Sequence, residues 1–252
     1  MDDLNEAELY ELLHRGHDGD IEFYQRCCET AALVLELGSG SGRAAIPLAR
    51  AGTTVVGLEL DEAMIALAQR ATEHEAPEVR ARLSWVRGDM TTYKLDQRFD
   101  RVLLPYNTLL CLLSPEETER CLALAHQHLK PQGQLVFDVY HADEMHRDAD
   151  EDDDSDDDEP LVTISHAEQV FDVYEQSDWL RDEQRLDTSY RFAPRDGEGD
   201  YTQRIPQRYL LSTEIQTLLE QHGFRLLRHD GGFNGETLSD DSLHHVVVAV
   251  RD

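Results

Sequence analysis

The stretch from Leu33 to Arg43 constrains the fold of this chain more than any other part of it. It reads LVLELGSGSGR, an apolar run that carries one acid, Glu36, and ends in three alternating glycines. With the AAIPLAR segment that follows, it predicts a buried strand, a tight turn and a helix N-terminus. Glycine has no Cβ and tolerates positive φ, so a ligand can approach such a turn and its free N–H groups. A turn that only joins strand to helix is the alternative.

The spacing of these residues is Glu-x-Gly-x-Gly-x-Gly, from Glu36 through Gly38 and Gly40 to Gly42. The dinucleotide fingerprint Gly-x-Gly-x-x-Gly requires its third glycine where this chain has Arg43. An NAD or nucleotide-sugar enzyme on a related fold is therefore disfavoured, and the stretch indicates another kind of ligand.

The charge of the chain is strongly unbalanced, with 52 acidic and 23 basic side chains. Ten of the acids lie in the run DADEDDDSDDDE, from Asp148 to Glu159, which predicts a solvated, disordered loop. The excess fits a surface that binds a cationic partner, or one that keeps the protein soluble at high salt, as in halophiles. Nucleic acid is not an expected partner, because phosphate contacts require clustered Lys and Arg.

The start of the chain, MDDLNEAELY, has no basic region and no apolar core, so no signal peptide is expected. No apolar run approaches the ~20 residues that span a membrane. The cysteines match no zinc pattern and no disulfide framework, so we expect a cytoplasmic protein with free thiols, no membrane contact and no metal. They are Cys27, Cys28, Cys111 and Cys121.

A second buried strand is expected from Thr53 to Leu60, with Glu59 near its end and Asp61 placed to cap the next helix. An acid at this position, about twenty residues beyond the glycines, is where a ribose diol is held. The two carboxylate oxygens match two neighbouring hydroxyls, so Glu59 is a candidate ribose ligand.

Two further strands end in polar side chains. The strand from Leu83 to Met90 ends in Gly-Asp-Met, where the Asp89 carboxylate can accept from the adenine amine while Met90 packs on the ring. The strand that begins at Phe99 runs to Pro105, and Tyr106 to Thr108 then fall at its carboxyl edge. Ligands of open α/β sheets bind at that edge.

The rest of the chain alternates helix and strand, which predicts a parallel doubly wound sheet. Ser114 to Glu117 form a capping box, Leu135 to Tyr140 form the fifth strand, and a late helix is capped at Ser212 or Thr213. Period-two segments between the acidic run and that helix predict about three antiparallel strands. The expected divisions are a helical cap (1–30), a Rossmann-like domain (31–145 and 212–252), an acidic loop (146–160) and an inserted antiparallel β subdomain (161–211).

With these residues in place, the chain resembles the class I S-adenosylmethionine (SAM)-dependent methyltransferases, in their small-molecule branch. The resemblance rests on DIEFY, VLELGSGSGR, GDM and LKPQGQLVFDVY in this order, and covers Asp20 to Tyr140 well. The tail from Leu161 looks like the inserted layer of sugar N-methyltransferases. The implied fold is α/β, with a Rossmann-like doubly wound seven-stranded sheet of order 3-2-1-4-5-7-6, strand seven antiparallel, and an inserted antiparallel β layer.

The resemblance also implies a set of site residues, in which the glycine loop holds the methionine portion of SAM. The cofactor-binding residues implied are Glu36, Gly38, Gly40, Gly42, Arg43, Glu59, Leu60, Met64, Asp89, Met90 and Pro105. The residues expected to serve the transfer are Tyr106, Asn107 and Tyr24.

The predicted function is methyl transfer from SAM to a small molecule by in-line displacement. A dedicated base is needed only when the nucleophile is protonated. The candidates are His14, His17, His141 and His229, and packing or surface roles are favoured for each. The fourth-strand edge lacks Asn-Pro-Pro-Tyr, the signature for methylating an exocyclic base amine or a glutamine amide.

Two questions stay open at this point. A SAM-binding protein without transfer activity, docking a basic partner on its acidic loop, is the alternative function. The inserted sheet is a candidate surface for a homodimer. The sequence does not name the methyl acceptor, nor whether nitrogen, oxygen or carbon is methylated.

Overall fold

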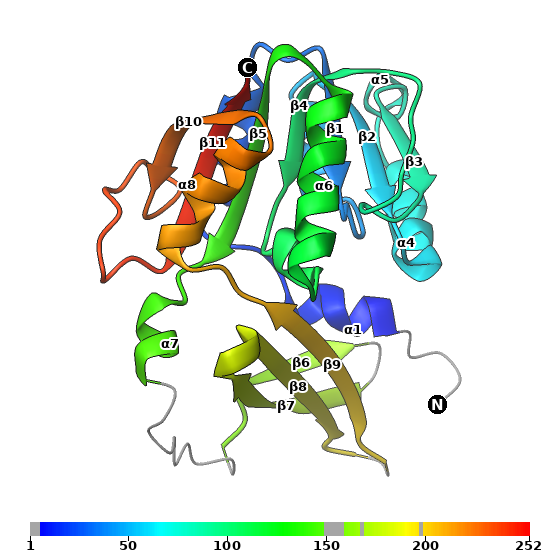
Figure 1. The fold of residues 1–252 in the computed structure, drawn as a ribbon. Helices are drawn as coiled ribbons and strands as arrows, with labels where there is room; N and C mark the ends of the chain where they lie inside the picture. The colour runs from blue at the N-terminus through cyan, green and yellow to red at the C-terminus, as the bar shows by residue number, and fades with distance from the viewer. Residues whose placement is uncertain (1–5, 149–158, 167–168, 197–198) are drawn as a thin grey trace.

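A seven-stranded sheet forms the centre of the computed structural model, which describes residues 6–148, 159–166, 169–196 and 199–252. Its order is β3-β2-β1-β4-β5-β11-β10, with β11 antiparallel to both neighbours and the other paired strands parallel (Figure 1). The predicted order is therefore confirmed. The strands are β1 (Leu33–Leu37), β2 (Thr54–Glu59), β3 (Leu83–Arg87), β4 (Phe99–Leu104), β5 (Leu129–Tyr140), β10 (Phe224–Asp230) and β11 (His244–Arg251).

Helices cover both faces of this sheet, because alternate side chains of each strand point to opposite cores. Leu35 of β1 packs in a core with Leu122 and Ile215, whereas the adjacent Val34 packs in a second core with Tyr24 and Leu48. The longer helices are α1 (Glu6–Leu13), α2 (Asp20–Cys28), α4 (Glu62–Glu73), α6 (Pro115–His128) and α8 (Ser212–Gln221). The short ones are α3 (Ala45–Arg50), α5 (Pro77–Arg80), α7 (Asp143–Asp148), η1 (Thr108–Cys111) and η2 (Arg181–Glu183).

The helix starts follow the sequence with one exception. The Asp61 carboxylate accepts from the Ala63 N–H at 2.8 Å, and the capping box of α6 is present. The prediction for α8 was wrong: the helix begins at Ser212, and Leu211 is its N-cap. The Ser212 hydroxyl donates to Asp143 instead, at 2.7 Å, so it does not cap its own helix.

The fifth strand is longer than predicted. It begins at Leu129, and LKPQGQ continues as strand beside β4 with an irregular register near Asp100. Gln132 adopts φ 61°, which lets the backbone pass Pro131 and Gly133 without leaving the sheet. The third strand is shorter than predicted, because β3 ends at Arg87.

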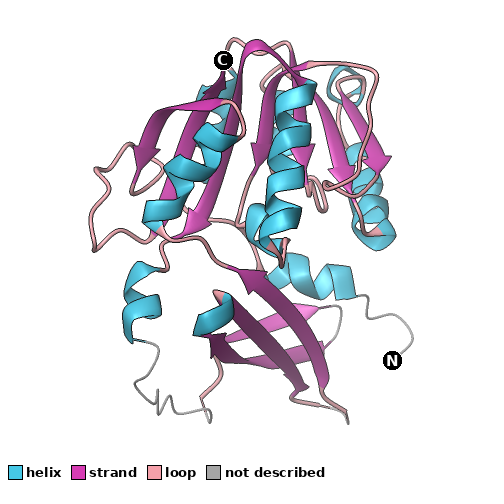
Figure 2. Cartoon of the chain, in the orientation of Figure 1, coloured by secondary structure: helices cyan, strands magenta, loops and turns pink. Residues whose placement is uncertain are grey.

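A second sheet has four antiparallel strands where about three were expected. It buries Phe171, Val173 and Phe192 against Leu9 of α1, and lies beyond the carboxyl ends of β1, β2 and β4 (Figure 1). Figure 2 shows this part as nearly all strand, in contrast to the alternating helices and strands above it. The strands are β6 (Val162–His166), β7 (Gln169–Leu180), β8 (Arg185–Pro194) and β9 (Tyr201–Arg208).

Most of the acidic run lies outside the described residues, so its predicted disorder stays a prediction, as do the four divisions of the chain. Within the described ranges, no helix has the length and apolar character needed to cross a membrane.

Candidate active site

The glycine turn after β1 has a packed side and an open side. All three glycines adopt positive φ, of 62°, 53° and 89° for Gly38, Gly40 and Gly42. A Cβ on Gly38 would lie 2.5 Å from Thr108, and one on Gly42 would lie 2.7 Å from Trp85. A Cβ on Gly40 would meet no described atom within 4 Å. The turn therefore packs through its outer glycines and presents the middle one to free space, which is the shape of a ligand cradle.

Glu59, at the end of β2, braces this turn. Its Oε2 accepts from the Gly40 N–H at 2.8 Å, and its Oε1 accepts from the N–H groups of Leu60 and Asp61 at 2.8 and 2.9 Å. A carboxylate has about four lone-pair positions, so one remains for a further donor. Leu60 beside it is 63% exposed, an apolar side chain presented at the edge of the cradle.

Asp89 and Met90 lie just beyond β3, both half-buried. Asp89 Oδ1 accepts from the N–H and the hydroxyl of Thr91, each at 2.7 Å, which fixes the carboxylate. Met64 on α4 is also half-buried. The structure thus places Glu59, Asp89 and the glycine turn at the carboxyl ends of three adjacent strands, as the sequence predicts.

Glu36, on β1 immediately before the turn, is a buried acid with an unused oxygen. It is 3% exposed, and its Oε2 has no hydrogen-bond partner among the described residues. Burial raises the pKa of Glu36 to about 8, although nearby Arg43 acts in the opposite direction. A buried carboxylate without a partner is costly, so this oxygen is suited to a cationic ligand.

Arg43 follows the glycine turn and lies between Asp20 and Tyr106. It forms an ion pair of 2.7 Å with the buried Asp20, and its guanidinium lies 5.1 Å from the centre of the Tyr106 ring. Gly16 makes room for it, since a Cβ there would lie 2.0 Å from Arg43 Nη1. Arg43 Nη2 is buried and finds no acceptor in the described part of the chain, so it is free to bind an anionic ligand group.

The edge after β4 is held in an unusual conformation. Tyr106 and Asn107 have φ of 56° and 61°, a region that non-glycine residues rarely adopt. Asp138 stabilises it: its carboxylate accepts from the Tyr106 N–H at 2.9 Å, and its carbonyl accepts from the Asn107 N–H at 3.2 Å. Asn107 Oδ1 accepts from the Tyr140 N–H at 2.8 Å, and Pro105 is buried. The Asn107 side chain therefore braces the edge.

Tyr24 was predicted to serve the transfer, but its side chain is not accessible to a methyl acceptor. It is fully buried, and its hydroxyl donates to Asp138 Oδ1 at 2.5 Å. Asp138 is fully buried as well, and burial raises its pKa to about 6 against the opposing hydrogen bonds from Tyr24 and Tyr106. Sequence reasoning missed Asp138, although an acid inside the apolar strand LVFDVY was a visible signal.

An aromatic cluster joins the two sheets at this edge. The His14 ring centre lies 4.3 Å from that of Tyr10, 5.1 Å from that of Tyr190 and 6.2 Å from that of Tyr106. Burial lowers the pKa of His14 to about 4, and its Nε2 is buried without a partner among the residues described. His14 is thus neutral at pH 7. Tyr190 comes from β8, and the sequence indicated only that it lies on a strand.

The other predicted histidines divide between two places. His17 lies in the same site, with its ring 4.8 Å from that of Tyr106, and burial lowers its pKa to about 4. His141 and His229 instead flank the buried His245, with ring centres 4.5 and 4.9 Å from it.

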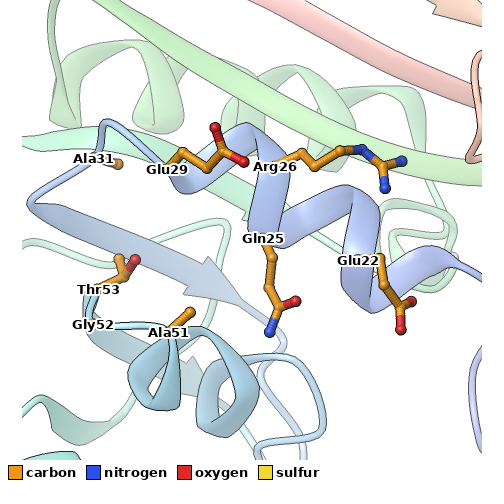
Figure 3. Close-up of a pocket in the computed structure, with 8 residues that line it drawn as sticks. All are labelled: Glu22, Gln25, Arg26, Glu29, Ala31, Ala51, Gly52 and Thr53. Atoms are coloured by element: carbon orange, nitrogen blue, oxygen red, sulfur yellow. The ribbon is translucent and has the colours of Figure 1, made fainter.

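A separate pocket of about 450 Å³ lies at the opposite end of β1 and β2 (Figure 3). None of the predicted site residues lines it. Its lining residues are Glu22, Gln25, Arg26, Glu29, Ala31, Ala51, Gly52 and Thr53.

The sheet order, the antiparallel β11 and the glycine turn with acids on three strand ends define the class I methyltransferase fold. Residues 34–133 match the methyltransferase domain family. The chain is similar over its whole length to the CcbJ methyltransferase from Streptomyces caelestis, with a TM-score of 0.76 at 23% identity and full coverage of both chains. It is also similar to DesVI from Streptomyces venezuelae, with a TM-score of 0.74 at 17% identity, covering 99% and 100% of the two chains.

Curated relatives match part of the chain. A dTDP-3-amino-3,6-dideoxy-alpha-D-glucopyranose N,N-dimethyltransferase from Streptomyces fradiae is 30% identical over 144 residues, which are 53% of this chain and 52% of the relative. A Geobacillus sp. (strain WCH70) protein named as a methyltransferase is 31% identical over 122 residues, 47% and 48% of the two chains. The chain thus spans about half the length of the curated relatives it matches.

Proposed function

We propose that this protein is a SAM-dependent methyltransferase whose acceptor is an amine on a small polar molecule. The observation that carries the proposal is the unused Oε2 of Glu36 beside the open face of Gly40, in a sheet of this order. The methyltransferase domain match supports the reaction class. The names of two relatives, an amino-sugar N,N-dimethyltransferase and an amino pentose methyltransferase, support an amine acceptor.

The residues present fit the cofactor. Glu36 would hold the ammonium of the methionine portion, and Arg43 Nη2 would hold its carboxylate, because both groups are buried without partners among the described residues. The remaining lone pair of Glu59 would accept from the ribose. Asp89 would accept from the adenine amine, and apolar contact with the ring would come from Leu60, Met64 and Met90.

When bound, SAM supplies an electrophilic methyl group on a sulfonium. The protein then has to orient the acceptor and exclude water, and positioning alone is worth ~7–11 kcal/mol in well-aligned reactions. The Tyr106–Asn107 edge, held by Asp138, would position the acceptor. His14 would accept a hydrogen bond from the N–H of the amine through its free Nε2, and so orient the acceptor, which attacks only in its unprotonated form.

Titration calorimetry of the full chain with SAM and S-adenosylhomocysteine tests the cofactor. Gly40→Ala should fold and lose affinity by tenfold or more, because its Cβ would fill the free space of the cradle. Gly52→Ala is the matched control: Gly52 has φ 107° and equally open surroundings, but lies at the far end of the sheet (Figure 3). Equal affinity of the two variants would contradict the assignment of the cradle.

A transfer assay on a panel of amine, hydroxyl and carboxyl acceptors tests the reaction. Transfer to amines is the expected result. Tight SAM binding with no transfer to any of the three classes would favour the alternative, a SAM-binding protein that works by interaction. A rise of Tm with NAD in place of SAM would favour a dinucleotide enzyme.

We also propose that the protein is cytoplasmic and that two copies associate through the small sheet. Sedimentation of the full chain tests the second point, and a monomer at micromolar concentration would contradict it.

A further inference from the structure

A cluster of polar side chains lies where the chain passes between the two sheets. His141 follows β5, Asp143 begins α7, Ser212 begins α8 and His245 is in β11. The segments that carry them meet at the lower end of β5 and β11 (Figure 1). The cluster therefore joins both connections of the small sheet to the core of the large one.

Three side chains of this cluster direct ligand atoms toward one another. Asp143 Oδ2 lies 3.2 Å from His141 Nε2 and 3.8 Å from His245 Nε2, and the three atoms all lie within 4.8 Å of each other. His245 is fully buried and the His141 side chain is 5% exposed. The ligand atoms around a tetrahedral zinc ion are about 3.3 Å from one another, because each lies about 2.0–2.1 Å from the metal.

The hydrogen bonds around the cluster leave it rich in acceptors. His141 Nδ1 lies 2.9 Å from the Ser242 carbonyl, which only accepts, so Nδ1 carries a hydrogen and, in the neutral ring, Nε2 presents a lone pair. His245 Nδ1 lies 2.9 Å from His229 Nε2, and a hydrogen on Nδ1 gives His245 Nε2 a lone pair as well. In both rings Nδ1 is hydrogen-bonded and Nε2 faces the cluster. Metal-binding histidines typically use one ring nitrogen for the metal and hydrogen-bond through the other.

One hydroxyl hydrogen then faces all three acceptors. The Ser212 hydroxyl lies 2.7 Å from Asp143 Oδ2, 3.2 Å from His141 Nε2 and 3.3 Å from His245 Nε2. The Ser212 N–H also donates to Asp143 Oδ2, at 3.1 Å. The hydroxyl has one hydrogen to donate, so at least one of the two histidine nitrogens is left without a donor. A cation at the centre would satisfy all three acceptors together.

We propose that His141, Asp143 and His245 bind a Zn²⁺ ion, with the Ser212 hydroxyl or a water as fourth ligand and His229 orienting His245. Two imidazoles and one carboxylate are a ligand set that zinc takes. The sequence predicted no metal, because the ligands do not form a local motif: the third lies about a hundred residues beyond the other two. The ion would tie both connections of the small sheet to β11 and so fix its position over the carboxyl edge.

The first test is a titration of the EDTA-treated full chain with ZnCl₂, and separately with CoCl₂, in excess Mg²⁺. Magnesium prefers oxygen ligands and occupies the carboxylates of the acidic run, so it leaves the imidazole site to zinc. We expect one equivalent of Zn²⁺ to bind and one equivalent of Co²⁺ to give the visible absorption of a tetrahedral site. Zinc should also raise Tm.

Variants separate this site from chance histidine binding. Asp143→Asn keeps an oxygen for the Ser212 hydrogen bonds, and it should weaken zinc binding by more than tenfold and remove the cobalt band. His141→Gln should do the same, and serves if the first variant does not fold. His74→Gln, at an exposed histidine that is the C-cap of α4, is the matched control and should bind as the wild type does. Absence of the cobalt band from the wild type, or equal zinc affinity in Asp143→Asn, would overturn the proposal.

Discussion

The two sheets of this protein are buried in different ways. In the large sheet, the six residues of β11 from His245 to Val250 are all buried, and β1 is nearly as enclosed. In the small sheet, β8 has two buried residues, Thr188 and Phe192. Helices cover the large sheet on both faces, whereas the small one packs on α1 through one.

This difference in burial suits the two sheets to different roles, one to holding a cofactor and the other to recognising a methyl acceptor. A core buried on both faces can support unpaired polar atoms such as Glu36 Oε2, because the surrounding packing keeps their positions fixed. A sheet buried on one face can change its side chains with little loss of stability. In the proposed reaction the cofactor half would lie on the large sheet, and the acceptor half would lie between the Tyr106 edge and the small sheet, which reaches the site through Tyr190. Substitutions in each half test this contrast.

Glu36→Gln should have the largest effect. It keeps the shape of the side chain but cannot ionise. Glu36 is mostly protonated at pH 7 in the free protein, and the ammonium of SAM would favour its charged form, which glutamine cannot supply. We expect a loss of affinity on the order of 100-fold, or about 3 kcal/mol, measured by calorimetry. Asp100→Asn, at an acid on β4 that pairs with Lys130 away from the turn, is the control and should bind SAM normally. Unchanged affinity in Glu36→Gln would contradict an ionic interaction between Glu36 and SAM.

The same acid should make stability depend on pH. The pKa of Glu36 is about 8 in the folded protein against about 4.5 in the unfolded chain, so the folded state binds the extra proton between these values. The contribution of Glu36 to the free energy of unfolding therefore falls as pH rises from 4.5 to 8, by up to about 3 kcal/mol at pH 7. Asp138 adds to the slope below pH 6. Buried histidines such as His14 add an opposite slope that the Glu36→Gln variant keeps, so the two proteins are compared. The free energy of unfolding of the wild type relative to Glu36→Gln should fall by about 2 kcal/mol from pH 6 to 8, and a constant difference would refute the assignment.

Tyr24→Phe should have the next largest effect. It removes the hydrogen bond to the buried Asp138, at a cost of about 2 kcal/mol in unfolding free energy, and loosens the Tyr106 edge. We expect kcat to fall about tenfold with SAM affinity kept. Tyr93→Phe is the control: the Tyr93 hydroxyl is buried without a partner in the described structure, so its removal should be neutral or stabilising. A similar loss in both variants would mean that Tyr24 acts only through packing.

His14→Asn tests the acceptor half. The ring lies between Tyr10, Tyr106 and Tyr190, so we expect a several-fold fall in kcat/KM for an amine and no change in SAM affinity. The pKa of about 4 predicts that His14 contributes no acid limb to the pH profile between 5 and 8. Reduced SAM affinity in this variant would place His14 in the cofactor half.

The sequence predicted that Glu59, Asp89 and the glycine turn meet at one sheet edge because the residues involved are local. Glu59 follows the glycines within one strand–turn–helix–strand unit, and parallel pairing alone brings Asp89 to the same edge. The acceptor half depends on contacts between distant segments, which periodicity does not encode. The sequence predicted only that Asp138 lies on a strand. The structure shows that its carboxylate accepts hydrogen bonds from both Tyr24 and Tyr106.

The metal site proposed above is a further example. His141 and His245 are brought together by the antiparallel pairing of β11 with β5, which sets His245 beside Val139. No spacing along the chain records that register. Each strand was predicted from its own apolar pattern. The cluster was missed because it depends on how the two strands pair.

The smallest effect is expected on the exposed face of the small sheet. Arg195 pairs with Asp172 through two hydrogen bonds of 2.8 and 2.9 Å, yet its side chain is 55% exposed. Water screens such a pair, so Arg195→Gln should shift Tm by less than about 2 °C and leave kcat unchanged. Phe171→Ala, at a buried position on the other face of the same sheet, should lower Tm severalfold more. If the two shifts were equal, the small sheet would be covered on both faces, as the proposed dimer requires, and the contrast with the large sheet would hold only for the single chain.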